Sequence, residues 1–240
     1  MEYVFATAVL LLAYFVRGLS GFGSGLVAVP LLALAFPLTW VVPFMLLMDF
    51  TASAILGRAN RHLVRWQELM PLAPGSVVGV VFGASLLLTL DRQVLLTSLG
   101  LLVMLFSLRN LLDLHGGRPI SRLWALPASF VGGTVSALFG TGGPPYVIYL
   151  SHRLRDKSAF RATTSVLFLL EGGLRGAVFV ASGLIQPRVL LGYALALPLM
   201  ALGLWAGSRV HLGLDNSQMT RVIGGLLLVS SAALLWKAAH

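Results

Sequence analysis

The sequence contains no cysteine, which excludes disulfide bonds, thiol catalysis and thiolate metal sites. It is also poor in charge, since 10% of its 240 residues are charged whereas 58% are hydrophobic. Acidic residues are the scarcer sign, with 8 Asp and Glu against 17 Lys and Arg. Apolar blocks recur from end to end, so lipid rather than water must surround most of this surface. The composition predicts an all-α integral membrane protein.

Other absences narrow the function. The five histidines fall in predicted loops or at the end of the chain, without the paired spacing that a metal site needs. No phosphate-binding loop ending in Gly-Lys-Ser or Gly-Lys-Thr is present, so nothing supports direct drive by ATP. The basic residues stand singly or in short loops between apolar blocks, which is typical of membrane orientation and not of nucleic-acid binding. We expect no metal, no cofactor and no nucleic-acid partner.

Glycine and proline divide the chain into ten apolar segments. They cover residues 3–17, 26–37, 40–57, 69–90, 94–114, 123–139, 145–151, 162–183, 189–207 and 220–238. A helix needs about 20 residues to span a bilayer, so several of these segments are too short to cross alone. The short ones occur in pairs around "GLSGFGSG" and "FGTGGPP", and three longer segments follow each pair. We predict helical hairpins broken by glycine at 3–37 and 123–151.

The two halves of the chain repeat one another. Five residues of the first half recur at a constant shift of 124: Pro74, Gly79, Gly83, Asp91 and Gly100 match Pro198, Gly203, Gly207, Asp215 and Gly224. Three residues of the first hairpin recur at a shift of 117: Phe22, Gly23 and Gly25 match Phe139, Gly140 and Gly142. We therefore predict a first repeat at 1–114, a cytoplasmic linker at 115–122 and a second repeat at 123–240, each a hairpin plus three transmembrane helices.

The basic residues predict how these repeats are oriented. They concentrate in the loops 58–68, 115–122, 152–161 and 208–219, whereas the alternate connections hold Arg92 and Arg188. If each hairpin enters and leaves on the same side, all four basic loops are cytoplasmic, as the positive-inside rule prefers. Each half then crosses the membrane an odd number of times. The halves become an inverted repeat, a plan found in many secondary transporters.

The glycine-rich breaks predict a binding site. In hydrocarbon, a broken helix is tolerated only where it is buried in protein or lines a wet cavity. A helix N-terminus favours anions, and glycine lets the backbone approach closely. We expect two such N-termini to face a small anion between the hairpins. The predicted substrate-binding residues are Arg17, Ser20, Gly21, Gly23, Ser24, Gly25, Gly140, Thr141, Gly142 and Gly143. The alternative is that the glycines only permit close helix packing.

Ionisable residues inside the predicted spans are costly and usually functional. Arg17 can form a charge-assisted fork with an oxyanion or pair with Asp49. Glu171 and Arg175 are four residues apart in the order that favours an ion pair on one helix face, so a structural pair is expected. Asp49, Glu171 and Arg175 are thus candidates for ion coupling or charge balance.

The stretches "GLSGFGSGLVAVPLL" and "ALFGTGGPPYVIYL", with the short basic loops and the duplicated layout, resemble the sulfite exporter TauE/SafE family, also called the sulfonate uptake permease family. The resemblance covers essentially the whole chain. It implies a carrier for small sulfur-containing or organic anions, such as sulfite or sulfonates, without catalytic residues. We expect a multi-pass protein of the cytoplasmic membrane, working by alternating access and coupled to a proton or sodium gradient. Substrate, direction and homo-oligomeric state stay open.

Two other classes of protein share parts of this pattern. Some intramembrane enzymes that act on lipid phosphates also use inverted repeats with re-entrant hairpins. They need clustered acids and an arginine-bearing catalytic loop, and "LAPGSVVG" has no such arginine. An anion channel is the other alternative. A carrier differs from a channel in a flux that saturates with substrate and falls steeply on cooling.

The predicted orientation can be tested by cysteine labelling. We expect single cysteines in the loops 58–68, 115–122 and 152–161 to react with an impermeant thiol reagent from the cytoplasmic side, because arginine-rich loops stay inside. The absence of native cysteine removes background labelling. Labelling of 152–161 from the outside would contradict the inverted repeat.

Overall fold

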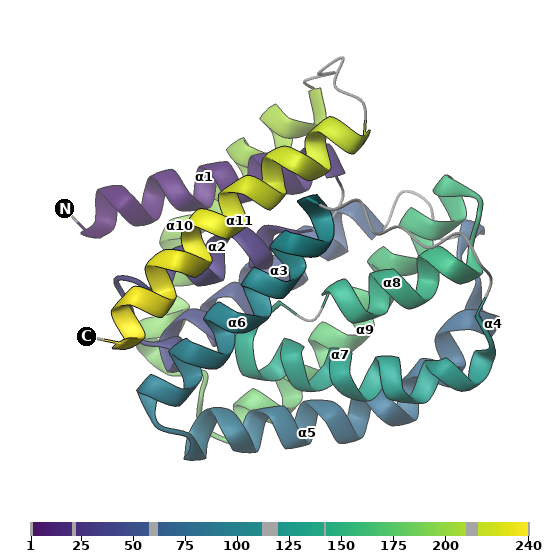
Figure 1. Cartoon of the computed structure of the whole chain (residues 1–240), viewed down its shortest axis with the longest axis horizontal. Helices are drawn as coiled ribbons and strands as arrows, with labels where there is room; N and C mark the ends of the chain where they lie inside the picture. Colours follow the sequence, from purple (N-terminus) through teal and green to yellow (C-terminus); the bar gives the residue numbers. More distant parts are fainter. Residues whose placement is uncertain are drawn as a thin grey trace. The chain divides into compact units, whose positions relative to one another are not determined.

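A computed structural model describes residues 2–20, 23–57, 62–111, 120–141, 143–209 and 216–239. Within this part of the chain all regular structure is helical (Figure 1). The α-helices are α1 (Glu2–Ser20), α2 (Ser24–Leu32), α3 (Leu38–Gly57), α4 (Trp66–Leu69), α5 (Ala73–Thr89), α6 (Arg92–Leu111), α7 (Ala125–Phe139), α8 (Gly143–Arg153), α9 (Lys157–Ala181), α10 (Pro187–Arg209) and α11 (Asn216–Ala239). Single 3₁₀ turns at Met70–Leu72 and Arg122–Trp124 precede α5 and α7.

Six stretches of the described residues are long and apolar enough to cross a membrane. They are Glu2–Leu19, Leu38–Ile55, Trp66–Thr89, Arg92–Arg109, Ser158–Ala181 and Pro187–Arg209. This confirms the prediction of an all-α membrane protein. The two helices that follow the glycine-rich breaks are short, with 9 residues in α2 and 11 in α8. The segment predicted at 26–37 ends early because α2 stops at Leu32, five residues before Pro37.

The chain divides into two compact units, and each draws on both halves of the sequence. The first unit consists of Met1–Val41, Thr89–His115 and Leu195–His240. In this unit α6 and α11 lie side by side over much of their length, as Figure 1 shows in teal and yellow. The Ser107 hydroxyl on α6 donates a hydrogen bond to the Gly224 carbonyl on α11 (2.6 Å). Helix α2 packs against α1, α6 and α11.

The second unit consists of Val42–Leu88 and Gly116–Ala194. Its core gathers around α8, which packs against α7 and α9. Leu72, Tyr146, Tyr149 and Leu150 are almost completely buried there. The Tyr146 hydroxyl is 2.7 Å from the Ser76 hydroxyl, and it donates to the Ser129 carbonyl (3.3 Å). The tyrosine therefore joins α8 to both α5 and α7.

Two glycines of α5 allow α7 to approach it closely. A methyl group on Gly79 would lie 2.3 Å from the Phe130 carbonyl oxygen, and one on Gly83 would lie 2.4 Å from that of Thr134. Both distances are far shorter than any ordinary contact. In the second unit, α5 and the first helix of the second hairpin thus meet backbone to backbone, as small residues permit in membrane helices.

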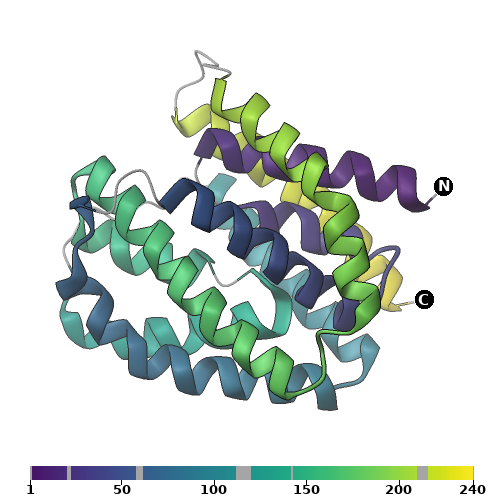
Figure 2. The same ribbon diagram turned by 180° about the vertical axis from the view of Figure 1, so that it is seen from behind.

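The matching glycines of α10 do the same for α1. A methyl group on Gly203 would lie 2.9 Å from Cβ of Tyr14, and one on Gly207 would lie 2.1 Å from the Phe15 carbonyl oxygen. Figure 2 shows α1 and the second half of α10 side by side, in purple and light green. Residues that the repeat predicts to be equivalent therefore make equivalent contacts. The inverted orientation and the division into repeats at 115–122 stay predictions.

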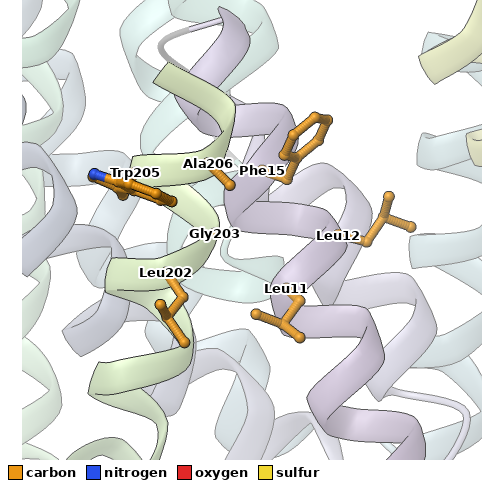
Figure 3. Close-up of a pocket in the computed structure, with 7 residues that line it drawn as sticks. All are labelled: Leu11, Leu12, Phe15, Leu202, Gly203, Trp205 and Ala206. Carbon is orange, nitrogen blue, oxygen red and sulfur yellow. The ribbon is translucent and has the colours of Figure 1, made fainter. Parts of the chain in front are cut away.

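An apolar groove runs along the outside of this α1–α10 contact. It is lined by Leu11, Leu12, Phe15, Leu202, Gly203, Trp205 and Ala206, which Figure 3 shows on the two helices. Near its end, the Arg209 guanidinium lies 4.8 Å from the centre of the Trp205 ring, within range of a cation–π contact. A lining of this kind suits contact with lipid chains, because both helices belong to stretches that can cross a membrane.

The glycine contacts predict which substitutions destabilise the fold. We expect Gly79→Ala and Gly203→Ala each to lower the melting temperature in detergent, at a cost of about 1–3 kcal/mol for forcing a methyl group into a closed contact. Gly176→Ala and Gly225→Ala are matched controls, because a methyl group meets nothing within 4 Å at either position. Equal melting temperatures in all four variants would show that these helices do not meet as described.

Candidate functional site

The first break lies between α1 and α2 in the first unit. Gly23 precedes α2 in a left-handed conformation (φ 96°), which glycine adopts without strain. Arg17 stands in the last turn of α1 and is 4% exposed. Its Nη1 donates a hydrogen bond to the Ser24 hydroxyl (2.9 Å), at the start of α2. A buried guanidinium thus joins the two helices across the break.

The second break lies between α7 and α8 in the second unit. Helix α7 ends at Gly140, which is left-handed (φ 66°) and donates its N–H to the Ser136 carbonyl (2.8 Å). Arg175 of α9 is 4% exposed, and its Nη1 donates to both the carbonyl and the hydroxyl of Ser136 (2.6 and 2.8 Å). A cation near a helix C-terminus is favourable because the carbonyls there carry partial negative charge. A buried guanidinium therefore stands at this break as well.

The two breaks differ in the backbone donors that they offer. The first turn of α2 has an N–H at each residue and no side-chain cap from Gly23. In α8 the second and third residues are Pro144 and Pro145, which lack an N–H. The sequence predicts two equivalent helix N-termini, but the second has fewer amides to give. Binding there depends more on side chains.

Several buried polar atoms near the second break have no hydrogen-bond partner among the described residues. They are Oγ1 of Thr141, Nε of Arg175 and, one helical turn before Arg175 on α9, Oε1 of Glu171. Thr141 is 3% exposed and Glu171 is 6% exposed. A buried polar group left unsatisfied costs about 1–3 kcal/mol, so native proteins keep few of them without a reason. A polar ligand can accept hydrogen bonds from the Arg175 Nε–H and the Thr141 hydroxyl, whereas a proton can only neutralise the carboxylate.

The structure changes one of the predicted interactions. Among the ion pairs of the described residues, none joins Glu171 and Arg175, although their spacing favours a pair. Arg175 instead donates to the hydroxyl and the carbonyl of Ser136 in the last turn of α7. Asp49 lies half-buried on α3, and its pairing with Arg17 stays a prediction.

The other predicted site residues are placed as follows. Ser24 and Gly25 are buried in the first turn of α2, and Thr141 is buried between Gly140 and the start of α8. Gly143 begins α8, where a methyl group would lie 3.4 Å from the Phe168 ring. Gly21, Gly142 and the side chain of Ser20 lie outside the described residues. Their roles stay predictions.

The sequence does not reveal a buried cluster around Glu68 of α4. Glu68 is 7% exposed and accepts hydrogen bonds from Arg153 (2.8 and 2.9 Å), Arg122 (3.1 Å) and the Tyr149 hydroxyl (3.3 Å). Hydrogen bonding to this carboxylate raises the pKa of Arg153 above its ordinary value. Tyr149 and Arg153 are four residues apart on α8, which is the one signal in the sequence that they act together. The cluster fixes the end of α8 to α4.

These features define a multi-pass membrane protein with two broken helical hairpins and a buried arginine at each break. Residues 6–234 match the sequence model of the family described as sulfite exporter TauE/SafE. The chain belongs to the TauE/SafE family and is a membrane transporter, not an enzyme. Its fold and its family both place it in the cell membrane.

Two relatives are transporters by name. The chain is 30% identical over 199 residues to the "Probable inner membrane transporter protein TsaS" of Comamonas testosteroni, covering 80% of this chain and 82% of that protein. It is also 30% identical over 204 residues to a "Probable membrane transporter protein" of Haemophilus influenzae, covering 76% of each chain. No solved structure matches the chain significantly.

The left-handed glycine at the first break predicts a specific substitution pattern. We expect Gly23→Ala to lower the melting temperature, because a left-handed alanine costs about 1–2 kcal/mol of folding free energy. Gly23→Asn should lower the melting temperature less, because asparagine tolerates this conformation. Gly183 is a matched position at which the same pattern is expected, since it is also left-handed (φ 70°) and a methyl group there would also meet nothing within 4 Å. If alanine and asparagine are equally tolerated at Gly23, the break has another backbone conformation.

Proposed function

We propose that this transporter is a secondary carrier of small oxyanions, with sulfite and sulfonates as the substrate class, and that the two hairpin breaks bind the anion in an alternating-access cycle. The observation that carries the proposal is the buried arginine at each break. Arg17 meets Ser24 at the first and Arg175 meets Ser136 at the second. The proposed site also includes the backbone around Gly23, Gly25, Gly140 and Gly143.

Burying a guanidinium within the membrane is expensive, and such charges usually mark the path of an ion or substrate. Arginine suits oxyanions because its planar fork presents parallel N–H donors to two oxygens. Arg175 keeps its positive charge uncompensated by any carboxylate within ion-pair distance, since its described partners are the neutral carbonyl and hydroxyl of Ser136. In this arrangement, an anion can bind Arg175 without displacing a carboxylate.

The comparisons support the same function at a coarser level. The family name refers to sulfite export, and the Comamonas relative is named as an inner membrane transporter. For this chain we propose an inner-membrane location, sulfite or sulfonate as substrate, and coupling to a proton or sodium gradient. Self-association of the chain is compatible with this mechanism and is not required by it.

An anion channel would use the same donors, so it is the second candidate. The unsatisfied polar atoms Nε of Arg175 and Oε1 of Glu171 favour a carrier, because they are buried away from solvent, whereas the polar lining of a continuous pore would be in contact with water. In proteoliposomes, a carrier gives a flux that saturates with substrate and falls steeply on cooling. A flux that rises linearly with concentration would favour the channel.

Removing either buried arginine tests the proposed site. We expect Arg17→Gln and Arg175→Gln each to weaken anion binding by about tenfold or more, because each loses a charge-assisted hydrogen bond worth about 1.5–3 kcal/mol. Since Glu171 does not occupy Arg175, nothing in the structure ranks one loss above the other. The measurement is uptake of radiolabelled sulfite, methanesulfonate, sulfate and acetate into proteoliposomes.

Arg188→Gln is the matched control, because Arg188 lies exposed at the start of α10. It should leave uptake unchanged. Failure of the wild-type protein to move any of the four anions, or normal uptake by both buried variants, would contradict the proposed function.

A further inference from the structure

Glu171 is a buried carboxylate on α9, one helical turn before Arg175, that the proposed site does not use. It lies in the middle of α9, within a stretch that can cross a membrane, and is 6% exposed. Its Oε1 has no hydrogen-bond partner. Among the described residues it forms no ion pair, even with Arg175 one turn further along α9.

An ionised carboxylate in this position would be costly. Taking a charge out of water costs several kcal/mol unless it is paired and hydrogen-bonded, and buried groups avoid the cost by becoming neutral. The guanidinium that could stabilise the ionised form donates to Ser136 instead.

The other titratable groups near Glu171 do not replace Arg175. Tyr146 on α8 lies close enough to interact electrostatically with both Glu171 and Arg175, but its hydroxyl is hydrogen-bonded to Ser76 and Ser129. Gly172 of α9 packs against Phe50 of α3, which is the neighbour of Asp49 in the sequence. Arg122 and Arg153 are already paired with Glu68 of α4. Among the described residues of α9, Arg175 is the cation one helical turn from Glu171.

We propose that Glu171 is a proton-binding site, and that its carboxylate and the transported anion alternate as partners of Arg175. This inference rests on the proposed function. When the anion occupies Arg175, Glu171 holds a proton and is neutral. When the anion leaves, Glu171 releases the proton to water, and its carboxylate swings to the guanidinium one turn away, where the spacing favours an ion pair.

This alternation couples the two movements. In one state the bound anion carries the negative charge and the Glu171 carboxyl is neutral. In the other state the anion is absent and the Glu171 carboxylate carries the charge. The site has the same net charge in both, so the charge of Arg175 is compensated in each. An anion that binds while Glu171 is ionised must displace it, which costs affinity. One proton therefore travels with each anion, and the transporter is a proton symporter.

The experiment uses methanesulfonate, whose charge does not change between pH 5 and pH 9, so any pH dependence belongs to the protein. In the wild type, affinity measured by calorimetry should be constant at low pH. It should fall at higher pH by up to about tenfold per pH unit, the limit for one proton taken up per anion. Glu171→Gln mimics the neutral carboxyl, so its affinity should stay high and independent of pH.

Transport measurements also distinguish the wild type from Glu171→Gln. In proteoliposomes, an inward proton gradient should drive accumulation of methanesulfonate by the wild type but not by Glu171→Gln. The variant should still exchange internal for external methanesulfonate, because exchange needs no release of the proton. The variant loses a buried ionisable group and gains none, so it should fold.

Two matched variants locate the effect. Glu68→Gln makes the same chemical change at the other buried glutamate of the second unit, and Asp49→Asn makes the corresponding change on α3. Both should keep the pH dependence of the wild type. A wild-type affinity that does not change with pH, a Glu171→Gln variant that still accumulates substrate, or a pH dependence removed by Asp49→Asn would overturn the proton site. If the wild type fails to move any anion, the proposed function fails instead.

Discussion

The structure depends on one constraint, which is that every backbone group inside a membrane needs a partner. A helix broken in the middle leaves carbonyls and amides exposed, and this chain breaks two. At both breaks a buried arginine meets a serine. Near the end of α7, Arg175 donates to the Ser136 hydroxyl and to its carbonyl, which also accepts the Gly140 N–H. At the start of α2, Arg17 donates to the hydroxyl of Ser24. The arginines stabilise the breaks, and the polar groups at the breaks provide hydrogen-bond acceptors for the buried guanidinium groups. In the proposed transport cycle, the same two side chains would also bind the substrate.

The short helices that follow the breaks are held by different means in the two units. Helix α2 is almost entirely apolar, contains Pro30 and is buried among α1, α6 and α11. Helix α8 is more polar and is held by hydrogen bonds, from Tyr146 to Ser76 and Ser129 and from Arg153 and Tyr149 to Glu68. Because hydrogen-bonded clusters are specific in geometry, the end of α8 has one defined position. The two short helices are thus placed alike in the chain but stabilised by different chemistry.

The sequence predicts the hairpins and most helix ends because glycine, proline and apolar periodicity act locally. The shared roles of Gly79 and Gly203 follow from the repeat in the same way. The partners of the charged residues do not, because they depend on which helices become neighbours. Helical spacing predicts a Glu171–Arg175 pair, but a carbonyl of α7, 39 residues away in sequence, takes the guanidinium. Glu68 and Arg153 are 85 residues apart, so no local pattern reveals their ion pair.

The prolines of α8 show that a residue pattern can predict a helix correctly and still mislead about a binding site. They are visible in the sequence and are well suited to a first helical turn, yet the same feature removes two amides from the helix N-terminus. The two prolines therefore fit the start of a helix but weaken the argument that backbone amides bind an anion there. The weight shifts to Arg175 and to the unsatisfied hydroxyl of Thr141.

The glycine contacts of α5 with α7 and of α10 with α1 also restrict how the protein can change shape. Where a single methyl group would already overlap a backbone carbonyl, one helix cannot slide along the other, because every step would drive a side chain into the main chain. Each hairpin is therefore bound to a long helix contributed by the opposite half of the sequence. In any transport cycle these pairs must travel as rigid bodies, and the hinges must lie at other points of the chain.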